Sequence, residues 1–182
     1  MKISQEAADV FSFPLFSKEF CVRVVESSQA LKWRRGDVYK GPRREYSKVR
    51  TCDEIRLKNF ILLREAFAEK FESVVAPAAK FCWQWQIRRW RDGRLLRYHP
   101  GDYFGRHVDY YPGSGVRYSR ILSLVCYLND GFSGGETRFL RQNRVVLPEA
   151  GKAVIFPSGM THPHCSEPVR AGTKQVFVAW LS

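Results

Sequence analysis

The chain has 182 residues, of which 45% are hydrophobic and 14% aromatic, and its formal net charge is +12. This length and composition predict one ordinary domain with a core large enough to fold without disulfides, and they exclude wholesale disorder. No run approaches the ~20 apolar residues of a membrane span, and the start lacks a secretory signal, so we expect a soluble cytoplasmic protein. The five cysteines are scattered and form no C-x-x-C pair, which is typical of reduced thiols.

Two helices are predicted in the first part of the chain. Ser17 is a candidate cap for a helix that runs to about Leu31. Residues 51–54 (TCDE) have the pattern of a capping box and predict a second helix that continues until Pro77. Between them, Lys32–Arg50 holds eight basic and two acidic residues, and we expect a long solvated loop there.

The second part of the chain is expected to consist of strands. Hydrophobic residues alternate over Phe81–Arg88, and Asp92-Gly93 then predicts a hairpin turn that returns the chain through Tyr98. Further strands are predicted at about 104–110, 119–128, 136–140, 145–147, 153–156 and 175–180. Short strands at this spacing, after two helices, predict an α+β fold in which a β-sandwich or jelly roll carries helices on one sheet.

Candidate metal ligands lie on these strands. His107 and Asp109 are two residues apart, so on a strand both side chains share one face and can reach one ion; a simple His–Asp hydrogen bond is the alternative. His164 is a candidate third ligand, and His162 is its rival. Two histidines and a carboxylate are the ligand set of non-haem Fe(II) oxygenases, although zinc hydrolases use similar ligands.

A lysine ten residues after His164 adds a second indication. If the ammonium of Lys174 is buried at the start of the last strand, it can meet the far carboxylate of a dicarboxylic cosubstrate, because a buried charge requires a partner. A lysine on the surface is the ordinary alternative.

From Tyr98 to Trp180 the chain resembles the 2-oxoglutarate and Fe(II)-dependent dioxygenases, in particular the prolyl 4-hydroxylase-like branch. The resemblance rests on five segments in the family's order: 97–109 (RYHPGDYFGRHVD), 120–129 (RILSLVCYLN), 134–139 (GGETRF), 148–156 (PEAGKAVIF) and 164–174 (HCSEPVRAGTK).

The resemblance implies a double-stranded β-helix, or jelly-roll, core with N-terminal helices packed on one sheet. The whole chain, 1–182, is then a single dioxygenase domain, with helical support and a basic loop in 1–80 and the core in 81–182. The implied residue roles are Fe(II) binding by His107, Asp109 and His164, 2-oxoglutarate binding by Lys174, Tyr98, Tyr127 and Thr137, and substrate contact by Arg120 and Trp180. His107, Asp109 and His164 are also the implied catalytic residues.

The implied reaction is hydroxylation of an unactivated C–H bond, with consumption of O2 and 2-oxoglutarate, release of succinate and CO2, and ascorbate as a reductant. The expected substrate is a prolyl residue of a peptide or protein. A free amino acid or small metabolite is the alternative. A nucleic acid demethylase is less favoured, because that relative has arginines where this chain has Lys174 and Trp180.

The excess charge lies near the expected site. Lys32–Arg50 contributes +6 and Arg88–Arg106 contributes +4. We therefore expect an acidic or ribonucleoprotein-associated protein partner, with no membrane and no direct nucleic acid binding. Lys32–Arg50 and Tyr110–Tyr118 are expected to be mobile segments that close over the substrate.

Overall fold

The structure, a computed structural model, describes residues 2–36, 38–40, 43–45, 49–110 and 120–182. The expected closing segment Tyr110–Tyr118, apart from Tyr110, lies outside these residues, as do parts of Lys32–Arg50. Within the described part of the chain, no helix is long and apolar enough to cross a membrane. All five cysteines are free thiols.

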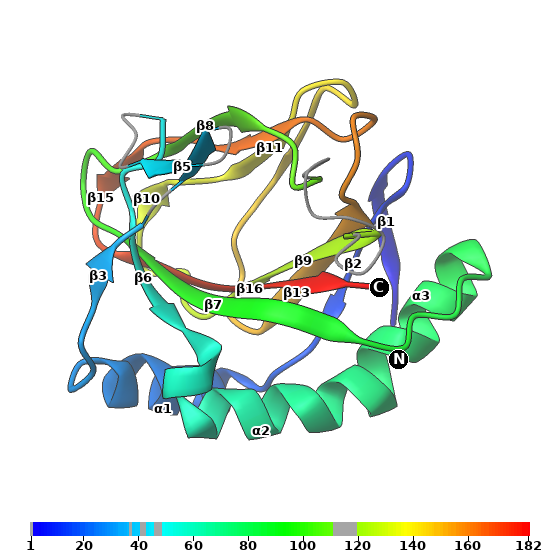
Figure 1. Ribbon diagram of the computed structural model, residues 1–182, viewed down its shortest axis with the longest axis horizontal. Coiled ribbons are helices and arrows are strands. Elements are labelled where there is room, and N and C mark those ends of the chain that lie inside the picture. Colours follow the sequence, from blue (N-terminus) through cyan, green and yellow to red (C-terminus); the bar gives the residue numbers. More distant parts are fainter. Residues whose placement is uncertain (1, 37, 41–42, 46–48, 111–119) are drawn as a thin grey trace.

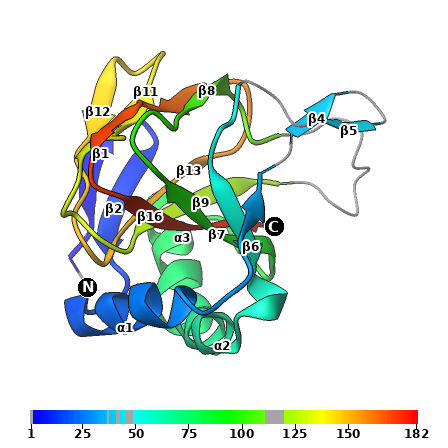
Figure 2. The same ribbon diagram turned by 90° about the vertical axis from the view of Figure 1, so that its left-hand side faces the viewer.

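Two antiparallel sheets face each other, and helices cover the outer face of the larger one (Figures 1 and 2). In spatial order, the larger sheet contains β1 (Ser4–Ala7), β2 (Val10–Pro14), β13 (Lys152–Pro157), β9 (Leu122–Tyr127), β16 (Lys174–Leu181), β7 (Trp90–Tyr98), β6 (Asp53–Arg56) and β3 (Arg34–Arg35). The smaller sheet contains β12 (Arg144–Val146), β11 (Thr137–Phe139), β14 (His164–Ser166) and β8 (Phe104–His107). The α+β class predicted from the sequence is confirmed, and backbone pairing within the described residues leaves the two sheets separate.

The remaining elements are shorter. Two strand pairs stand apart from the main sheets: β10 (Ser133–Gly134) with β15 (Val169–Ala171), and β4 (Val38–Lys40) with β5 (Arg43–Glu45). The helices are α1 (Lys18–Ser28), the 3-10 turn η1 (Leu57–Asn59), α2 (Ile61–Lys70), the π-helical turn η2 (Phe71–Val75) and α3 (Ala76–Trp83).

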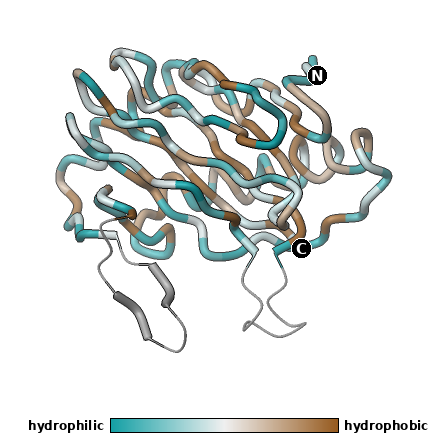
Figure 3. Tube along the Cα trace, turned by 90° about the horizontal axis from the view of Figure 1, so that it is seen from above, coloured by the Kyte–Doolittle hydropathy of each residue, from teal (hydrophilic) through white to brown (hydrophobic). Residues whose placement is uncertain are grey.

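The larger sheet separates two hydrophobic clusters, because successive side chains of a strand point to opposite faces. On β16, Phe177 packs toward the helices, where its ring lies 4.5 Å from that of Phe67. Its neighbour Val176 packs between the sheets with Phe139 and Phe156. Hydrophobic residues accordingly recur along the central strands in Figure 3. The helices therefore complete one core, and the other core surrounds the space between the sheets.

The predicted cap of the first helix is confirmed. The Ser17 side chain accepts a hydrogen bond from the backbone N–H of Phe20, and α1 follows it directly. The strands expected from residue 104 onward are also present as β8, β9, β11, β12, β13 and β16, whereas β1, β2, β10, β14 and β15 were not predicted.

The capping-box prediction at residues 51–54 is wrong, and so is the helix end at Pro77. Residues 53–56 form strand β6, paired with β7, and helix α2 begins only at Ile61. The helical path then continues through the π-helical turn to Trp83, with Pro77 in the first turn of α3. Proline is tolerated there because N–H groups of a first helical turn make no bond within that helix.

The strand predicted over Phe81–Arg88 and the hairpin at Asp92-Gly93 are wrong as well. Phe81 belongs to α3, and Gln84, the C-cap residue directly after this helix, has the left-handed conformation. Asp92 and Gly93 lie inside the single long strand β7, at a point where its register with β16 shifts by one residue. Asp92 has a φ of 51°, so the Asp-Gly pair forms a β-bulge rather than a turn.

Gly151 joins the N-terminal segment to the core and gives a test of the fold. Its carbonyl accepts hydrogen bonds from the backbone N–H groups of Leu15 and Phe16, and its own N–H donates to Tyr127. Its φ is +88°, and a Cβ atom there would lie 2.1 Å from the Phe16 carbonyl oxygen. We expect Gly151→Ala to lower the free energy of unfolding by about 3 kcal/mol in urea denaturation.

Gly101 provides the matched control, because its φ is +89° but a Cβ there meets nothing within 4 Å. Gly101→Ala should lower the free energy of unfolding only by the cost of holding alanine at a positive φ, about 1 kcal/mol. Equal losses for the two variants would contradict the steric contribution at Gly151.

Candidate metal centre

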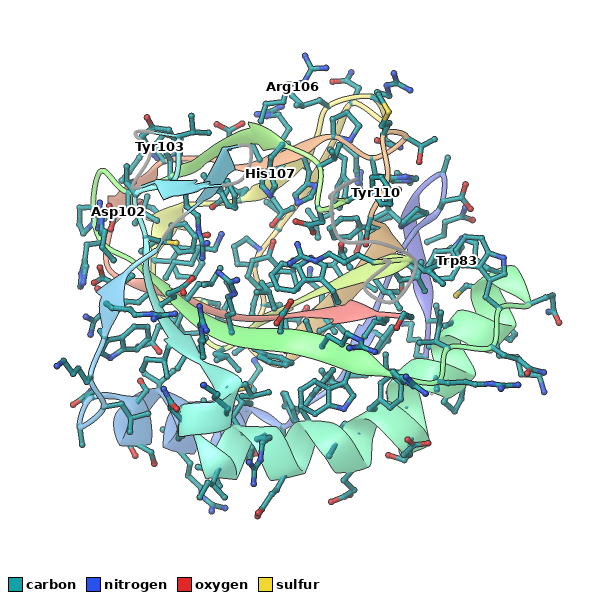
Figure 4. The ribbon with its side chains drawn as sticks, viewed as in Figure 1. Trp83, Asp102, Tyr103, Arg106, His107 and Tyr110 are labelled. Atoms are coloured by element: carbon teal, nitrogen blue, oxygen red, sulfur yellow. The ribbon has the colours of Figure 1, made fainter. Side chains whose placement is uncertain are left out.

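Two strands of the smaller sheet bring the three predicted ligands together. His107 ends β8, Asp109 follows two residues later, and His164 begins β14. The register places His164 opposite His107. One ligand atom from each of the three residues lies within 4.8 Å of the others. In Figure 4 His107 lies toward the space between the sheets, whereas its neighbour Arg106 lies at the outer edge.

The orientation of both imidazoles suits metal binding. Nδ1 of His107 lies 2.8 Å from the carbonyl oxygen of Gly105, and Nδ1 of His164 lies 3.1 Å from that of His162. Donation from each Nδ1–H leaves the Nε2 lone pair available. The two Nε2 atoms lie 3.6 and 3.7 Å from the Asp109 carboxylate oxygens. Carbonyl groups that fix the tautomer in this way are usual behind metal-ligating histidines.

The charge states are also those of ligands. Burial, reinforced by the nearby His164, lowers the pKa of His107 to about 3, so its imidazole is neutral at physiological pH. Burial alone would raise the pKa of Asp109, but His164, His107, a Ser123 hydrogen bond and the charge of Arg120 together lower it. The neutral His107, the Asp109 carboxylate and His164 therefore converge, and two imidazoles with one carboxylate are a donor set that fits Fe(II) and also Zn(II).

The three residues line a cavity that is open to solvent and that, with the space at its mouth included, measures about 560 Å³. Its walls come from both sheets. The described lining residues are Arg50, Leu96, Tyr98, Phe104, His107, Asp109, Leu124, Val125, Thr137, His164, Cys165, Ser166, Lys174, Val176, Val178 and Trp180. Among them Asp109 is the one carboxylate, and Arg50 and Lys174 carry positive charge.

Lys174 is buried in this cavity, with 1% of its surface exposed. Its ammonium donates to the Gly135 carbonyl at 2.6 Å and to the Ser166 hydroxyl at 2.7 Å. A Cβ on Gly135 would lie 3.0 Å from the Lys174 Cδ, so the glycine leaves room for this side chain. Burial lowers the pKa of Lys174 to about 7, and no ion pair among the described residues includes it. The site fits an anionic ligand, because a carboxylate would offset the cost of the buried ammonium.

The three predicted hydroxyl groups differ in position. Tyr98 and Thr137 line the cavity, and the Tyr98 ring centre lies 4.8 Å from the Lys174 ammonium. Tyr127 is fully buried behind the wall and donates to the Thr137 hydroxyl at 2.7 Å. Burial raises the pKa of Tyr127 to about 12, so it remains a donor. Tyr127 therefore orients Thr137 rather than lining the cavity itself.

Arg120 and Trp180 form a stacked pair beside the ligands. The Arg120 guanidinium carbon lies 3.7 Å from the centre of the Trp180 ring, and its NH1 donates to the Asp109 carbonyl at 3.0 Å. Trp180 lines the cavity. Arg120 thus holds both the backbone of a candidate ligand and a cavity wall.

The two other histidines are excluded from the triad. His162 is buried with its ring nitrogens near the Thr161 hydroxyl and the Ala8 carbonyl. His99 is half-exposed and lies 3.8 Å from an Asp53 oxygen. His164 is the third residue of the cluster.

Arg50 is a cavity residue that sequence reasoning did not identify, because it lies at the end of the segment expected to be a solvated loop. It is 6% exposed and lines the cavity beside Phe104. No local pattern distinguishes it from the other basic residues of Lys32–Arg50.

Comparisons with known proteins agree with this geometry. Residues 93–182 match the 2OG-Fe(II) oxygenase superfamily. A protein of Acanthamoeba polyphaga mimivirus that has been assigned as a prolyl 4-hydroxylase is 32% identical over 106 residues, covering 50% of this chain and 44% of its own. Human procollagen-lysine,2-oxoglutarate 5-dioxygenase 2 is 26% identical over 184 residues, covering 98% of this chain and 24% of its own.

Solved structures show the same fold. The structure of a Trichoplax adhaerens prolyl hydroxylase in complex with a hypoxia inducible factor peptide fragment superposes with a TM-score of 0.76 at 15% identity, covering 95% of this chain and 83% of the other. The chain spans less than half the length of the curated relatives described above. The matched segment contains the His107, Asp109 and His164 cluster, and the chain belongs to the 2OG-Fe(II) oxygenase superfamily.

Proposed function

We propose that the protein is an Fe(II)- and 2-oxoglutarate-dependent dioxygenase that hydroxylates a prolyl residue of a peptide or protein. The observation that carries the proposal is one cavity that combines the His107, Asp109 and His164 cluster with the buried ammonium of Lys174. A metal and a dicarboxylate are the ligands that these two features require together. The two facing sheets would then form the double-stranded β-helix of the family.

The roles of the residues follow from their positions. His107, Asp109 and His164 would hold Fe(II), and Lys174 would bind the distal carboxylate of 2-oxoglutarate, with Tyr98 and Thr137 along its length. Bound Fe(II) supplies the coupling of O2 reduction to the oxidative decarboxylation of 2-oxoglutarate, which yields succinate, CO2 and the hydroxylated substrate. Arg120 and Trp180 would position the primary substrate over the ligands. Ascorbate as a reductant and a cytoplasmic location stay predictions.

Prolyl and lysyl residues are both substrates that the relatives' names suggest, and the cavity favours prolyl. A lysyl ammonium would enter a space whose described walls contain the ammonium of Lys174 and one carboxylate, Asp109, which would be committed to the metal, whereas the charge of Arg50 is paired with Glu54. The apolar ring of a prolyl residue would instead contact the apolar side chains of the cavity wall. The aliphatic lining residues are Leu96, Leu124, Val125, Val176 and Val178.

An acidic protein partner remains part of the proposal, but two of the arginines outside the cavity contribute less to it than the sequence suggested. Arg34 pairs with Glu54, and Arg35 pairs with Asp53 and Asp102. These arginines hold β3 against the rest of the protein, so they are poorly placed to recruit a partner.

The test is succinate formation together with a search for the product. The purified protein with Fe(II), 2-oxoglutarate and proline-containing peptides or cell extract should release succinate, and mass spectrometry should find a proline that has gained one oxygen atom. His107→Ala and Asp109→Ala should each lower turnover at least ~100-fold, because each removes a metal ligand. Equilibrium dialysis should show weaker Fe(II) binding in the same variants.

His99→Ala is the matched control, because His99 is half-exposed and outside the triad. It should retain wild-type turnover and metal binding. Oxygen gained by a lysine, a free amino acid or a metabolite, with unmodified proline, would reject the prolyl assignment. If the protein binds neither Fe(II) nor 2-oxoglutarate, the proposal that it is a dioxygenase is rejected.

A further inference from the structure

Ser123 is a buried serine of strand β9 that faces the space between the two sheets. Val125 and Tyr127, two and four residues further on, pack in the hydrophobic cluster between the sheets. Side chains at this spacing share one face of a strand. Ser123 is 1% exposed and is not among the described residues that line the cavity. Its hydroxyl therefore lies behind the cavity wall, where it can act on a wall residue but cannot contact a ligand.

The cross-strand neighbours of Ser123 place it beside the candidate ligands. It is paired with Phe156 of β13 on one side and with Trp180 of β16 on the other. The ring centre of Phe156 lies 4.7 Å from that of His164. Trp180 lines the cavity together with Asp109. Strand β9 faces β8 of the smaller sheet across this space (Figure 1), so Ser123 lies in the row of side chains that faces the ligand cluster.

The Ser123 hydroxyl has a hydrogen-bond partner on each side. One partner is the Asp109 carboxylate, and the other is the hydroxyl of Ser158, whose oxygen lies 2.7 Å away and which is also 1% exposed. An ionised carboxylate can only accept hydrogen bonds, so the single proton of Ser123 is donated to Asp109. Ser158 must then donate its proton to Ser123. The hydrogen bonds therefore run in one direction, from Ser158 through Ser123 to Asp109.

The backbone around Asp109 is held by the same region. The Ser158 carbonyl accepts a hydrogen bond from the backbone N–H of Tyr110 at 2.9 Å, and Arg120 donates to the Asp109 carbonyl at 3.0 Å. The main chain on the C-terminal side of Asp109 is thus fixed by two bonds. The Ser123 hydroxyl adds the bond that fixes the carboxylate itself.

Asp109 requires this support because strand β8 ends two residues before it, at His107. The torsion that turns a carboxylate about its last carbon–carbon bond has only broad preferences, so hydrogen bonds decide its orientation. We propose that Ser123 is a positioning residue that holds the Asp109 carboxylate in the orientation in which it meets the metal, and that Ser158 orients Ser123. This inference rests on the proposed function, because it takes the three residues of the cluster as ligands of Fe(II).

The experiment measures the metal affinity of serine-to-alanine variants of the untagged full chain. Ni(II) is the probe, because it binds sites of this kind more tightly than Fe(II) does, and calorimetry measures its Kd. We expect Ser123→Ala to weaken Ni(II) binding ~10-fold or more, the range found when a hydrogen bond to a metal ligand is removed. Ser158→Ala should weaken it less, because Ser123 keeps its own bond to Asp109.

Ser12→Ala is the matched control. Ser12 is a buried serine of the same sheet, 4% exposed, and it also donates to a carboxylate, that of Glu6, at 2.8 Å. Neither residue is among the described residues of the cavity. Ser12→Ala should lower the urea midpoint about as much as Ser123→Ala does. Its Ni(II) Kd should stay within about twofold of wild type, because distant sites contribute independently.

The Asp109→Ala background tests whether Ser123 acts through this carboxylate. The two histidines remain there, and Ni(II) binds imidazole well enough for a weaker Kd to be measured. In this background Ser123→Ala should change the Kd by less than about twofold, because the group that it orients is already absent. A serine that only stabilises the fold would give the same loss in both backgrounds.

Three results would overturn the inference: an unchanged Ni(II) Kd in Ser123→Ala, an equal loss of affinity in Ser12→Ala, or an equal loss from Ser123→Ala in the Asp109→Ala background. A wild type that binds neither Ni(II) nor Mn(II) would reject the metal centre, and the proposed function with it. Ni(II) binding that depends on Ser123, in a protein that forms no succinate with Fe(II), would support the inference and reject the proposed reaction.

Discussion

Lys174→Met is expected to abolish measurable 2-oxoglutarate binding while making the ligand-free protein more stable. The wild type buries an ammonium whose pKa is lowered to about 7, which means that the folded state disfavours its charge. Methionine removes that cost but leaves the Gly135 carbonyl and the Ser166 hydroxyl without this donor. We expect a net gain of roughly 1–2 kcal/mol in the free energy of unfolding near pH 7.

The stability difference between Lys174→Met and the wild type should depend on pH. The folded-state pKa lies below the ordinary value of 10.5, so between pH 7 and 10.5 the unfolded chain binds more protons than the folded one. The stability of the wild type should therefore rise through that window relative to the variant, and the advantage of Lys174→Met should shrink. Urea denaturation at several pH values measures this. An advantage that does not change with pH would contradict the buried ammonium.

Ligand binding should make the wild type more stable than Lys174→Met, which reverses their order without ligand. A saturating ligand at 100 times its Kd stabilises the folded state by about 2.7 kcal/mol. With Mn(II) present throughout, added 2-oxoglutarate should therefore raise the melting temperature of the wild type and leave that of Lys174→Met unchanged. Equal shifts would show that the distal carboxylate does not use Lys174.

Glu54→Gln is expected to be the most destabilising of these substitutions. Glu54 is fully buried and bonds the buried side chains of Arg50 and Arg94. Removing the shared carboxylate leaves two interior guanidinium groups without this counter-charge, which costs about 3–5 kcal/mol in comparable cases. Urea denaturation followed by tryptophan fluorescence measures the loss.

Arg34→Gln is the matched control, because it removes a half-exposed contact to the same carboxylate and should lower the free energy of unfolding by less than about 1 kcal/mol. Acid provides a second readout. Burial raises the pKa of Glu54, but Arg94 and Arg50 outweigh it and lower the pKa below 4.5. The stability that Glu54 contributes should be lost as the pH falls below that value, and Glu54→Gln should lack this part of the acid transition. A loss under 1 kcal/mol for Glu54→Gln would contradict the ion network.

The candidate ligands were predictable because their signal is local or depends on a simple register. His107 and Asp109 need only the twofold repeat of a strand, which β8 provides up to His107. His164 and Lys174 came from the resemblance to the family and from their spacing. The structure places His164 opposite His107 and buries Lys174.

The failures share one physical cause, which is that partners distant in the sequence override a local pattern. Residues 51–54 read as a helix cap, yet Glu54 is held by Arg94, forty residues further on. Asp92-Gly93 reads as a turn, yet strand β16 pairs with β7 on both sides of it. Leu57 also explains the glycine, because a Cβ on Gly93 would lie 2.6 Å from its Cδ2. None of these partners is visible in a window of ten or twenty residues.

Arg50 is a residue of the candidate site that could not be predicted for the same reason. Its burial depends on Glu54, Phe104 and Gly36, which belong to three separate segments. Composition placed it in a basic loop, and only the fold separates this interior cation from its exposed neighbours.

The position of β16 has a consequence for biosynthesis. This strand, Lys174–Leu181, lies in the middle of the larger sheet between β9 and β7, and β2 near the start of the chain pairs with β13. The larger sheet therefore cannot form completely until β16 has emerged from the ribosome. High sequence separation between paired strands slows such folding. His107 at the end of β8 and Asp109 just after it are synthesised before His164, so the candidate metal centre can be completed only after β14 has been made.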